Sequence, residues 1–311
     1  MESYALGIDI GGTKTAVGIF DAGFHEVKRV TLPTQPQDGC RELVRRIGGA
    51  YRALLRETGI AAPAILSVGA ACPGPLDLEK GAIVHIPTMG FRNEPLVQYL
   101  EQELERTVAL ENDTNAAALC ESVFGLGKGL SLVVYVTIST GVGCGIAYRR
   151  EILDGAAFSA GELGHFKVVR GGRACACGGR GCLEAYASGT AIAAIAAERT
   201  GRRVDAKEVF ARARKQEPPF IGVVREAAQH LGYAVACVYQ LLDPDIVVLG
   251  GSVTKDYDVL GPLLHDAVRQ YVQEVPGRCC RLEVSRYGGG QVLLGAAYYG
   301  ARQAQGEPIS K

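Results

Sequence analysis

The sequence of 311 residues has no tryptophan, and aromatic residues make up only 7% of it. It also lacks an excess of either charge, because 33 Lys and Arg residues balance 33 Asp and Glu residues. The basic surface that nucleic-acid binding requires is therefore not expected. No apolar run approaches the roughly 20 residues that a membrane-spanning helix needs. The composition thus excludes nucleic acid and membrane as expected partners.

The sequence does contain enough apolar residues, 48% of the total, to build one large domain or two ordinary ones. The first residues, MESYALGIDI, carry no cationic start followed by an apolar run, and the cysteines outside one cluster are spread singly along the chain. Disulfide frameworks belong mainly to short secreted chains. We therefore expect a cytoplasmic protein with reduced thiols.

A histidine and three cysteines are concentrated between residues 165 and 182, in the segment HFKVVRGGRACACGGRGC. The cysteines Cys175, Cys177 and Cys182 fall within eight residues and are interleaved with glycines. Thiolate sulfur and imidazole nitrogen are the ligands that tetrahedral Zn²⁺ prefers. Unrelated core cysteines are the alternative, but the segment is too compact and glycine-rich for core packing. It predicts a zinc site with His165 as the fourth ligand and no open position for a reacting water.

The hydrophobic pattern predicts alternating strands and helices, which is typical of an α/β fold. Strands are expected at residues 4–10, 15–20, 64–70, 107–110, 132–138, 146–148 and 246–249. Helices are expected at 41–58, 95–106, 116–124, 185–199, 223–242, 260–272 and 288–304, with links at 201–203 and 216–219. Two similar strand, glycine-turn, strand units indicate a duplicated domain. We expect one domain at 1–118 and a larger one at 119–289, with a C-terminal helix at about 290–311 packing back on the first.

Two glycine-rich turns are candidates for phosphate binding. The first is Gly11-Gly12-Thr13-Lys14. Gly7 and Gly12 have the glycine spacing of a Walker A loop, but Thr13 takes the lysine position and a strand follows instead of a helix. Its backbone N–H groups, Thr13 and Lys14 can still bind phosphate, with Asp9 holding hydrated Mg²⁺. An ordinary Gly-Gly hairpin is the alternative. The second turn, at 139–145, has the same design.

The segment Glu111-Asn112-Asp113-Thr114-Asn115 lies between the predicted strand 107–110 and the predicted helix 116–124. Asp113 has two interpretations. As an N-cap it would accept backbone N–H groups at the helix start, which is worth about 1 kcal/mol. As a general base it would take a proton from a sugar hydroxyl that attacks a γ-phosphate. The spacing alone favours the cap.

Five motifs, in order, resemble those of the ROK family of sugar kinases and sugar-responsive repressors: DIGGTK (9–14), ENDTNAA (111–117), STGVGCG (139–145), GELGH (161–165) and CACGGRGCLE (175–184). The resemblance extends from Leu6 to about Ala297. It implies a two-domain α/β fold of the actin and hexokinase type, with ATP and sugar meeting between the domains beside a small zinc-binding loop. It also implies ATP-dependent phosphorylation of the 6-hydroxyl of a hexose, with glucose the first choice, and a homodimer or homotetramer.

The same resemblance implies a role for each matching residue. Asp113 is expected to be the catalytic base. The sugar site is expected to contain Gly74, Asn112, Asp113, Glu162, His165 and Glu184. The phosphates and Mg²⁺ are expected near Asp9, Gly11, Gly12, Thr13, Lys14, Thr140 and Gly141, and the adenosine near Gly250 and Gly251. One ring nitrogen of His165 would bind zinc while the other contacts a sugar hydroxyl.

Other functions and substrates are open alternatives. N-acetylmannosamine or N-acetylglucosamine can replace glucose, and polyphosphate can replace ATP. Fructose is disfavoured, because fructokinase-like members carry Glu-Cys-Gly-His where this chain has GELGH at 161–165. A repressor is disfavoured because the first strand, beginning at about Tyr4, leaves no room for a winged helix-turn-helix. Ser139 and Gln291 depart from the family pattern. A zinc-ribbon interaction module on an inactive scaffold is the third class of function.

Overall fold

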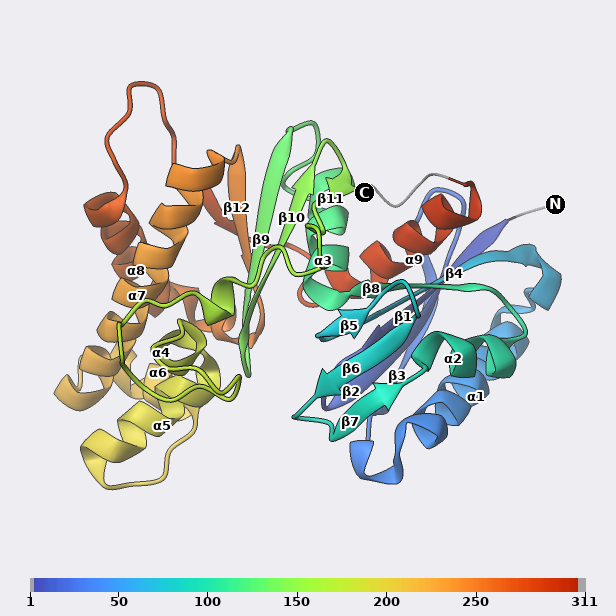
Figure 1. Ribbon diagram of the computed structural model, residues 1–311, viewed down its shortest axis with the longest axis horizontal. Helices are drawn as coiled ribbons and strands as arrows, with labels where there is room; N and C mark the ends of the chain where they lie inside the picture. Colours follow the sequence, from blue (N-terminus) through green and yellow to red (C-terminus); the bar gives the residue numbers. More distant parts are fainter. Residues whose placement is uncertain (1–2, 307–311) are drawn as a thin grey trace. The chain divides into compact units, whose positions relative to one another are not determined.

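The computed structural model describes residues 3–306, which form two compact units (Figure 1). The first unit takes the residues up to Cys120, the segment Glu151–Ala160 and the residues from Gly290 onward. The second unit takes Glu121–Arg150 and Gly161–Gly289. Each unit combines one five-stranded sheet with helices, so the predicted α/β class is confirmed.

The sheet of the first unit has the strand order β3-β2-β1-β4-β8. Its strands are β1 (Tyr4–Ile10), β2 (Lys14–Phe20), β3 (Glu26–Pro33), β4 (Ile65–Cys72) and β8 (Val108–Asn112). The β1, β2 and β3 strands pair antiparallel, whereas β4 runs parallel to both β1 and β8. Parallel neighbours need a long crossover. Here the crossovers contain α1 (Cys40–Thr58) and α2 (Leu96–Leu104), with the small sheet of β5 (Leu76–Asp77), β6 (Ala82–Ile86) and β7 (Phe91–Glu94) before α2.

The two faces of this sheet carry side chains of different size. Leu6, Ile8 and Ile10 of β1 belong to the core that also contains α1 and α2. Alternate residues of a strand point to opposite faces. The intervening Gly7 accordingly meets α9 (Gln291–Ala304), where a Cβ on Gly7 would lie 2.4 Å from the carbonyl oxygen of Leu293. The glycine lets the α9 backbone pack directly on the sheet.

The other five-stranded sheet repeats this plan in the order β11-β10-β9-β12-β13; β9, β10, β12 and β13 belong to the second unit, whereas β11 lies in the segment assigned to the first. Its strands are β9 (Leu132–Ile138), β10 (Val142–Tyr148), β11 (Glu151–Ile152), β12 (Ile246–Gly250) and β13 (Leu282–Val284). β9 and β10 pair antiparallel, and β12 runs parallel to β9 and β13. The core side chains of β9 pack with helices of the same unit: α4 (Glu184–Ala187), α5 (Gly189–Thr200), α6 (Ala206–Arg214), α7 (Pro218–Leu242) and α8 (Tyr257–Tyr271).

Local polar chemistry corrects several predicted boundaries. The helix predicted at 185–199 is broken at Ser188, which has an extended backbone and caps α5 by accepting a hydrogen bond from the Ala191 N–H at 3.0 Å. The predicted link at 216–219 contains the start of α7, because proline is tolerated in the first turn of a helix. The predicted turn at 139–145 is shorter, because residues from Val142 onward already pair with β9.

Several elements were not predicted. β3 has mostly exposed residues, so the alternation of apolar and polar side chains that marks a half-buried strand is weak. The strands of the small sheet, β13 and α6 are short and were also missed. The predicted C-terminal helix corresponds to α9, and residues 307–311 lie outside the described residues.

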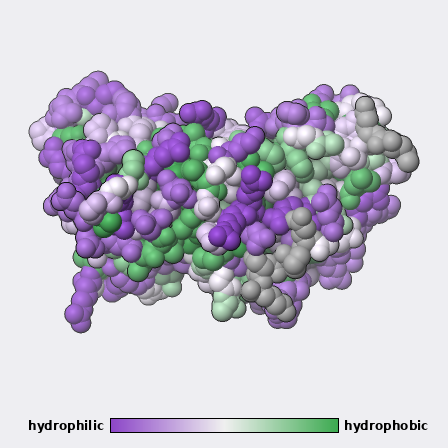
Figure 2. Space-filling view, turned by 90° about the horizontal axis from the view of Figure 1, so that it is seen from above, coloured by the Kyte–Doolittle hydropathy of each residue, from purple (hydrophilic) through white to green (hydrophobic). Residues whose placement is uncertain are grey.

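None of the helices within residues 3–306 is both long enough and apolar enough to cross a membrane. Hydrophilic and hydrophobic residues are interspersed over the face displayed in Figure 2.

Candidate functional site

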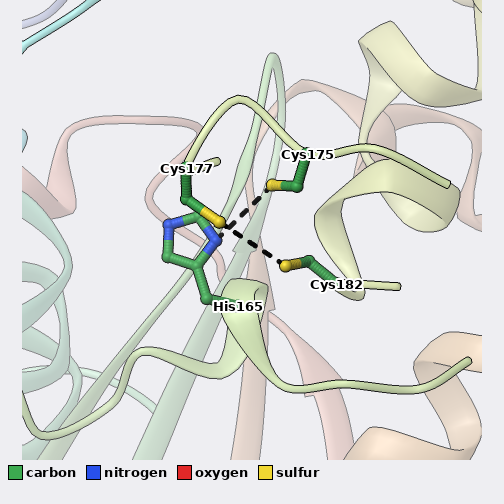
Figure 3. A group of neighbouring side chains, drawn as sticks. All are labelled: His165, Cys175, Cys177 and Cys182. Atoms are coloured by element: carbon green, nitrogen blue, oxygen red, sulfur yellow. Dashed lines mark hydrogen bonds between the residues drawn. The ribbon is translucent and has the colours of Figure 1, made fainter. Parts of the chain in front are cut away.

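His165, Cys175, Cys177 and Cys182 come together in the second unit, and Figure 3 shows their side chains gathered around one point. Their donor atoms all lie within 4.8 Å of one another. Cys177 Sγ is 3.6 Å from Cys182 Sγ, and Cys175 Sγ is 3.8 Å from His165 Nδ1. Sulfur donors about 2.3 Å from a tetrahedral zinc are separated by about 3.8 Å. The donor set and its spacing therefore fit Zn²⁺, with all four positions filled by protein.

The loop at residues 165–182 is folded by its glycines. The Cys175 N–H donates to the carbonyl oxygen of Gly179 at 2.9 Å, which closes the turn that carries two of the cysteines. Gly178 and Gly181 have φ values of 85° and 79°, a region that residues with a Cβ rarely adopt. The interleaved glycines of the motif are thus required by the shape of the loop.

Lys167 lies beside the cluster and was not predicted as a site residue. Its Nζ is 2.8 Å from Cys182 Sγ and 2.9 Å from the carbonyl oxygen of His165. The hydrogen bond to Cys182 raises the pKa of Lys167, so its ammonium keeps its charge. Three thiolates around a dication leave one net negative charge, which this ammonium offsets.

Glu184 connects the cluster to the second glycine turn. Its Oε1 lies 3.9 Å from Cys175 Sγ, and its Oε2 accepts a hydrogen bond from the Val142 N–H at 3.1 Å. Gly141 leaves the space for this carboxylate, because a Cβ there would lie 2.5 Å from Glu184 Oε2. A predicted sugar residue and a predicted phosphate residue are therefore in contact in the second unit.

The second turn, Ser139–Gly141, is fixed by the beginning of α5. The Gly189 N–H donates to the carbonyl oxygen of Ser139 at 2.7 Å, and Thr190 Oγ1 donates to that of Thr140 at 2.9 Å. Ser139 stands where the family pattern frequently has glycine, and its hydroxyl lies 3.1 Å from the hydroxyl of Ser252. The departure thus adds a side-chain link from the turn to the residue after Gly250-Gly251.

Gly250 and Gly251, predicted near the adenosine, lie where β12 ends beside β9. A Cβ on Gly250 would lie 2.0 Å from the Tyr135 hydroxyl oxygen, and one on Gly251 would lie 2.3 Å from the carbonyl oxygen of Ile138. Gly251 also has a φ of 92°. Both glycines are therefore needed for the close packing of β12 on the strand that leads into the second turn.

The first turn, Gly11–Thr13, is supported by Thr34. The Thr34 N–H donates to the carbonyl oxygen of Thr13 at 2.9 Å, and Thr34 Oγ1 donates to that of Gly11 at 2.6 Å. Thr34 is fully buried, whereas Gly12, Thr13 and Lys14 are exposed. Because the turn joins the antiparallel strands β1 and β2, the exclusion of a Walker A loop is confirmed.

Asn112 and Asp113 lie where β8 ends and α3 (Asp113–Val123) begins. Asn112 Oδ1 accepts hydrogen bonds from the Thr114 N–H at 2.9 Å and from Thr114 Oγ1 at 2.6 Å. Asn112 therefore takes the N-cap position, and Asp113 is the first helical residue, with Oδ1 2.8 Å from the same N–H. The predicted helix start at 116 and the N-cap position of Asp113 are both wrong. Gly74 packs against the Asn112 amide, where a Cβ would lie 3.3 Å from Nδ2.

Asp9 and Asp113 influence each other within the first unit. Burial, and then the negative charge of Asp113, raise the pKa of Asp9 to about 7. Neighbouring carboxylates that repel each other in this way are stabilised by a divalent cation, and Mg²⁺ prefers oxygen ligands. The residues present therefore fit a hydrated Mg²⁺ at Asp9.

Glu162 and His165 line a hollow of about 360 Å³ in the second unit. His165 Nε2 lies 3.9 Å from Glu162 Oε2, whereas Nδ1 faces the cysteine cluster. The two ring nitrogens thus face different groups, as the predicted double role of His165 requires. A larger cavity of about 690 Å³ in the first unit, lined by β4, β8 and α9, contains none of the predicted site residues.

Comparison with known proteins identifies the family. The model of the ROK family matches residues 5–303. The chain belongs to the ROK family. It is 34% identical to a glucokinase of Halalkalibacterium halodurans over 83% of each chain. It is 30% identical to an N-acetylmannosamine kinase of Haemophilus influenzae over 94% of each chain.

A solved ROK structure agrees with this assignment. The crystal structure of a ROK family glucokinase from Streptomyces griseus, in complex with glucose and AMPPNP, has a TM-score of 0.83 and 28% sequence identity to this chain. The match covers 96% of this chain and all of that chain. The predicted two-domain kinase fold of the ROK family is thereby confirmed.

Five residues that support this ROK site were not predicted from the sequence; four of them are buried, and Lys167 is exposed. Glu111 and Asn115 stand inside the ENDTNAA motif, where attention went to the carboxylate at the helix start. Thr34, Asp154 and Lys167 gave no signal, because their partners are distant in the sequence or are backbone atoms.

Proposed function

We propose that this ROK protein is an ATP-dependent hexose kinase that phosphorylates the 6-hydroxyl of glucose. The observation that carries the proposal is the position of Asp113, which begins α3 directly after the capping residue Asn112 and interacts with the carboxyl of Asp9. The ROK glucokinase of H. halodurans and the S. griseus structure with glucose and AMPPNP, an ATP analogue, support this choice.

Sugar recognition is assigned to carboxylate and amide side chains. Each carboxylate of Glu162 and Glu184 can accept two hydroxyl hydrogens, and the Asn112 amide can both donate and accept. Glu184 is already oriented by the Val142 N–H. His165 Nε2 contributes one more polar contact, and the two carboxylates and the amide select a polyhydroxylated ring.

Phosphoryl transfer needs positioning and charge neutralisation more than covalent chemistry. Asp113 takes the proton of the 6-hydroxyl as that oxygen bonds to the γ-phosphorus, and the bond from this phosphorus to the departing ADP oxygen breaks. The backbone N–H groups of Gly11–Thr13 and Thr140–Gly141 hold the phosphates, with Thr13 and Lys14. Mg²⁺ bound near Asp9 supplies neutralisation of the phosphate charge.

The zinc cluster has a structural role in this proposal. Zn²⁺ bound by His165, Cys175, Cys177 and Cys182 supplies a fixed orientation for the imidazole. Because Nδ1 faces the cysteines, Nε2 is the nitrogen left for the sugar. None of the ten cysteines forms a disulfide, which supports a cytoplasmic location with a reducing environment.

We also propose a homodimer or homotetramer. Phe166, Tyr233 and Tyr271 form a partly exposed aromatic group on the second unit, with ring centroids 6.2 Å and 5.4 Å apart for successive pairs. Exposed aromatic groups of this kind are enriched in protein interfaces. Light scattering on the purified protein tests this proposal, and a monomer at micromolar concentration contradicts it.

The direct test of the kinase is an ADP-release assay across a panel of hexoses. The panel contains glucose, N-acetylmannosamine, N-acetylglucosamine and fructose, with ATP or polyphosphate as donor and with Mg²⁺ and Zn²⁺ present. We expect the highest kcat/KM for glucose with ATP. A higher kcat/KM for N-acetylmannosamine would support the second candidate, which the H. influenzae relative favours. Absence of turnover with every sugar contradicts the proposal.

A further inference from the structure

A buried polar cluster lies within the first unit, next to the Asn112–Asp113 junction. Its members come from four places in the chain: Glu111 from β8, Asn115 from α3, Asp154 from the segment 151–160 and Tyr299 from α9. Each is buried, with between 0% and 7% of its surface exposed. None of them has a role in the proposed phosphoryl transfer.

Glu111 is the centre of this cluster. Its Oε1 accepts hydrogen bonds from the Asn112 N–H at 2.7 Å and from Asn115 Nδ2 at 3.1 Å. The Asn115 amide also lies 3.3 Å from Asp154 Oδ1. Glu111 Oε1 therefore fixes both Asn112, directly before Asp113, and the Asn115 side chain. Asp154 contacts the same Asn115 amide.

We propose that Glu111 is a positioning residue for the catalytic base: its Oε1 fixes Asn112 and Asn115, and thereby sets the orientation of Asp113 for proton transfer. This inference rests on the proposed kinase function. Because Glu111 acts through the backbone of β8 and the first turn of α3, it needs no contact with sugar or ATP. A misplacement of about 1 Å at a reacting group is enough to lower a rate about 100-fold.

The surroundings of Glu111 favour a neutral acid. Its Oε2 is buried and is not paired in a regular hydrogen bond among residues 3–306, and the Tyr299 hydroxyl is the side-chain group that interacts with this carboxyl besides Asn115. Burial, and then the charge of Asp154, raise the pKa of Glu111 to about 8, while burial raises the pKa of Asp154 to about 6. The other titratable groups that face it, Cys72 of β4 and Tyr299 of α9, have pKa values raised mainly by burial and stay neutral. At neutral pH only Asp154 is charged among them.

Ionisation of Glu111 is expected to disturb the site. Two carboxylates, Glu111 and Asp154, would then share one Asn115 amide in a buried environment, where like charges repel strongly. Arg302 of α9 lies 3.8 Å from Glu151 of the same segment, and its charge also acts on Tyr299 of the cluster. Loss of the hydrogen bond between Asn115 Nδ2 and Glu111 Oε1 would leave the first turn of α3, which carries Asp113, less firmly fixed.

The test compares Glu111→Gln, Glu111→Ala and Glu121→Gln with the unchanged enzyme in the hexose assay. Glutamine keeps the oxygen that accepts both hydrogen bonds and cannot ionise. We therefore expect Glu111→Gln to rescue kcat at pH 7 and to remove the decline of kcat above about pH 8. Glu111→Ala is expected to lower kcat about 100-fold with little change in the KM for glucose.

Glu121→Gln is the matched control. Glu121 is also a buried glutamate of α3, but it accepts hydrogen bonds from the Leu126 N–H and Ser285 Oγ, away from the junction. Its variant is expected to keep the alkaline decline. Infrared difference spectroscopy between pH 6 and pH 10 gives a readout independent of activity. Asp9 contributes a titrating protonated-carboxyl band in every variant. We expect Glu111→Gln to lose the further band that titrates near pH 8, and Glu121→Gln to keep it.

The outcomes separate the inference from the kinase proposal. If the unchanged protein phosphorylates no sugar, the kinase proposal fails, and the infrared comparison still decides the protonation of Glu111. If the enzyme is active but Glu111→Gln loses as much kcat as Glu111→Ala at pH 7, the positioning role is wrong. Persistence in Glu111→Gln of the alkaline decline, or of the infrared band that titrates near pH 8, overturns it equally. Should Glu111→Ala fail to fold, the pH profile of Glu111→Gln decides alone.

Discussion

The turn Gly11–Thr13 of the first unit and the turn Ser139–Gly141 of the second occupy the same position in two sheets of matching strand order and direction. Around the first turn and its sheet the chain gathers carboxyls with raised pKa values: Asp9, Glu111 and Asp154. Around the second it gathers a cysteine and histidine cluster and the carboxylate of Glu184, fixed by a backbone N–H. The same strand order therefore carries carboxyls that titrate near neutral pH in the first unit, and side chains held in fixed orientations in the second.

This difference predicts where substitutions act. Changes in the first unit are expected to alter kcat and its pH dependence, because the carboxyls there titrate near the working pH. Changes in the second unit are expected to alter zinc content, stability and the KM for sugar. A first-unit substitution that changes only the KM for sugar, or a second-unit substitution that changes only kcat and its pH dependence, would contradict this difference.

The largest expected effect is that of Asp113→Asn. Removal of the base is expected to lower kcat by about 10² to 10⁴, while glucose binding measured by calorimetry is retained. Asp266→Asn, at an exposed position of α8, is the control and is expected to change neither quantity. Activity within tenfold of the unchanged enzyme would show that Asp113 is not the catalytic base.

Cys177→Ser tests the second unit. Loss of one ligand is expected to release zinc, measured by atomic emission, and to raise the KM for glucose about tenfold through His165, with a smaller change in kcat. Cys279→Ser removes an exposed thiol of the same unit outside the cluster and is expected to keep zinc and KM unchanged. An unaltered KM in a zinc-free Cys177→Ser protein would refute the coupling between metal and sugar.

Local patterns carried the successful sequence predictions. The strands of both hairpins and the cysteine cluster were predictable, because alternation and ligand spacing are written within short segments. The break at Ser188 could not be predicted from helical periodicity, because it depends on a cap and on the bond from Gly189 to the distant Ser139. The spacing placed Asp113 correctly at a helix start, but Asn112 and not Asp113 takes the N-cap position.

Tertiary contacts account for what remained hidden in the site. Asp154 meets Asn115 across 39 residues, and Thr34 meets Gly11 across 23. Thr and Asp are common at protein surfaces, so the sequence does not mark these two residues. Their role follows from their burial in the fold. The roles of the predicted sugar, phosphate and zinc residues stay predictions that the substitutions above can test.

The pH dependence of stability sharpens the description of the first unit. The folded pKa of Glu111 is about 8, raised from the ordinary value of 4.5, so the folded protein binds a proton that the unfolded chain releases. This contribution is fully present below about pH 4.5 and is lost as pH rises toward 8. The slope is about 1.4 kcal/mol per pH unit for one proton.

Glu111→Gln is expected to remove this slope from the free energy of unfolding, measured by urea denaturation between pH 5 and pH 8. Asp154 contributes in the same direction at lower pH, because burial raises its pKa to about 6. Glu79→Gln changes an exposed glutamate of the same unit and is expected to leave the slope intact. An identical slope in the Glu111 variant would contradict the buried neutral acid.

The smallest expected difference separates the two turns themselves. In Gly141→Ala the new Cβ would lie 2.5 Å from Glu184 Oε2, so the carboxylate must leave the Val142 N–H or the turn must move. In Gly12→Ala the nearest atom, Thr88 Oγ1, is 4.0 Å away. We expect Gly141→Ala to lose about 1–3 kcal/mol of unfolding free energy, as overpacked sites do. Gly12→Ala should lose less than about 0.5 kcal/mol, as surface substitutions do. Equal losses would mean that the second turn yields as easily as the first, and that Glu184 does not hold it.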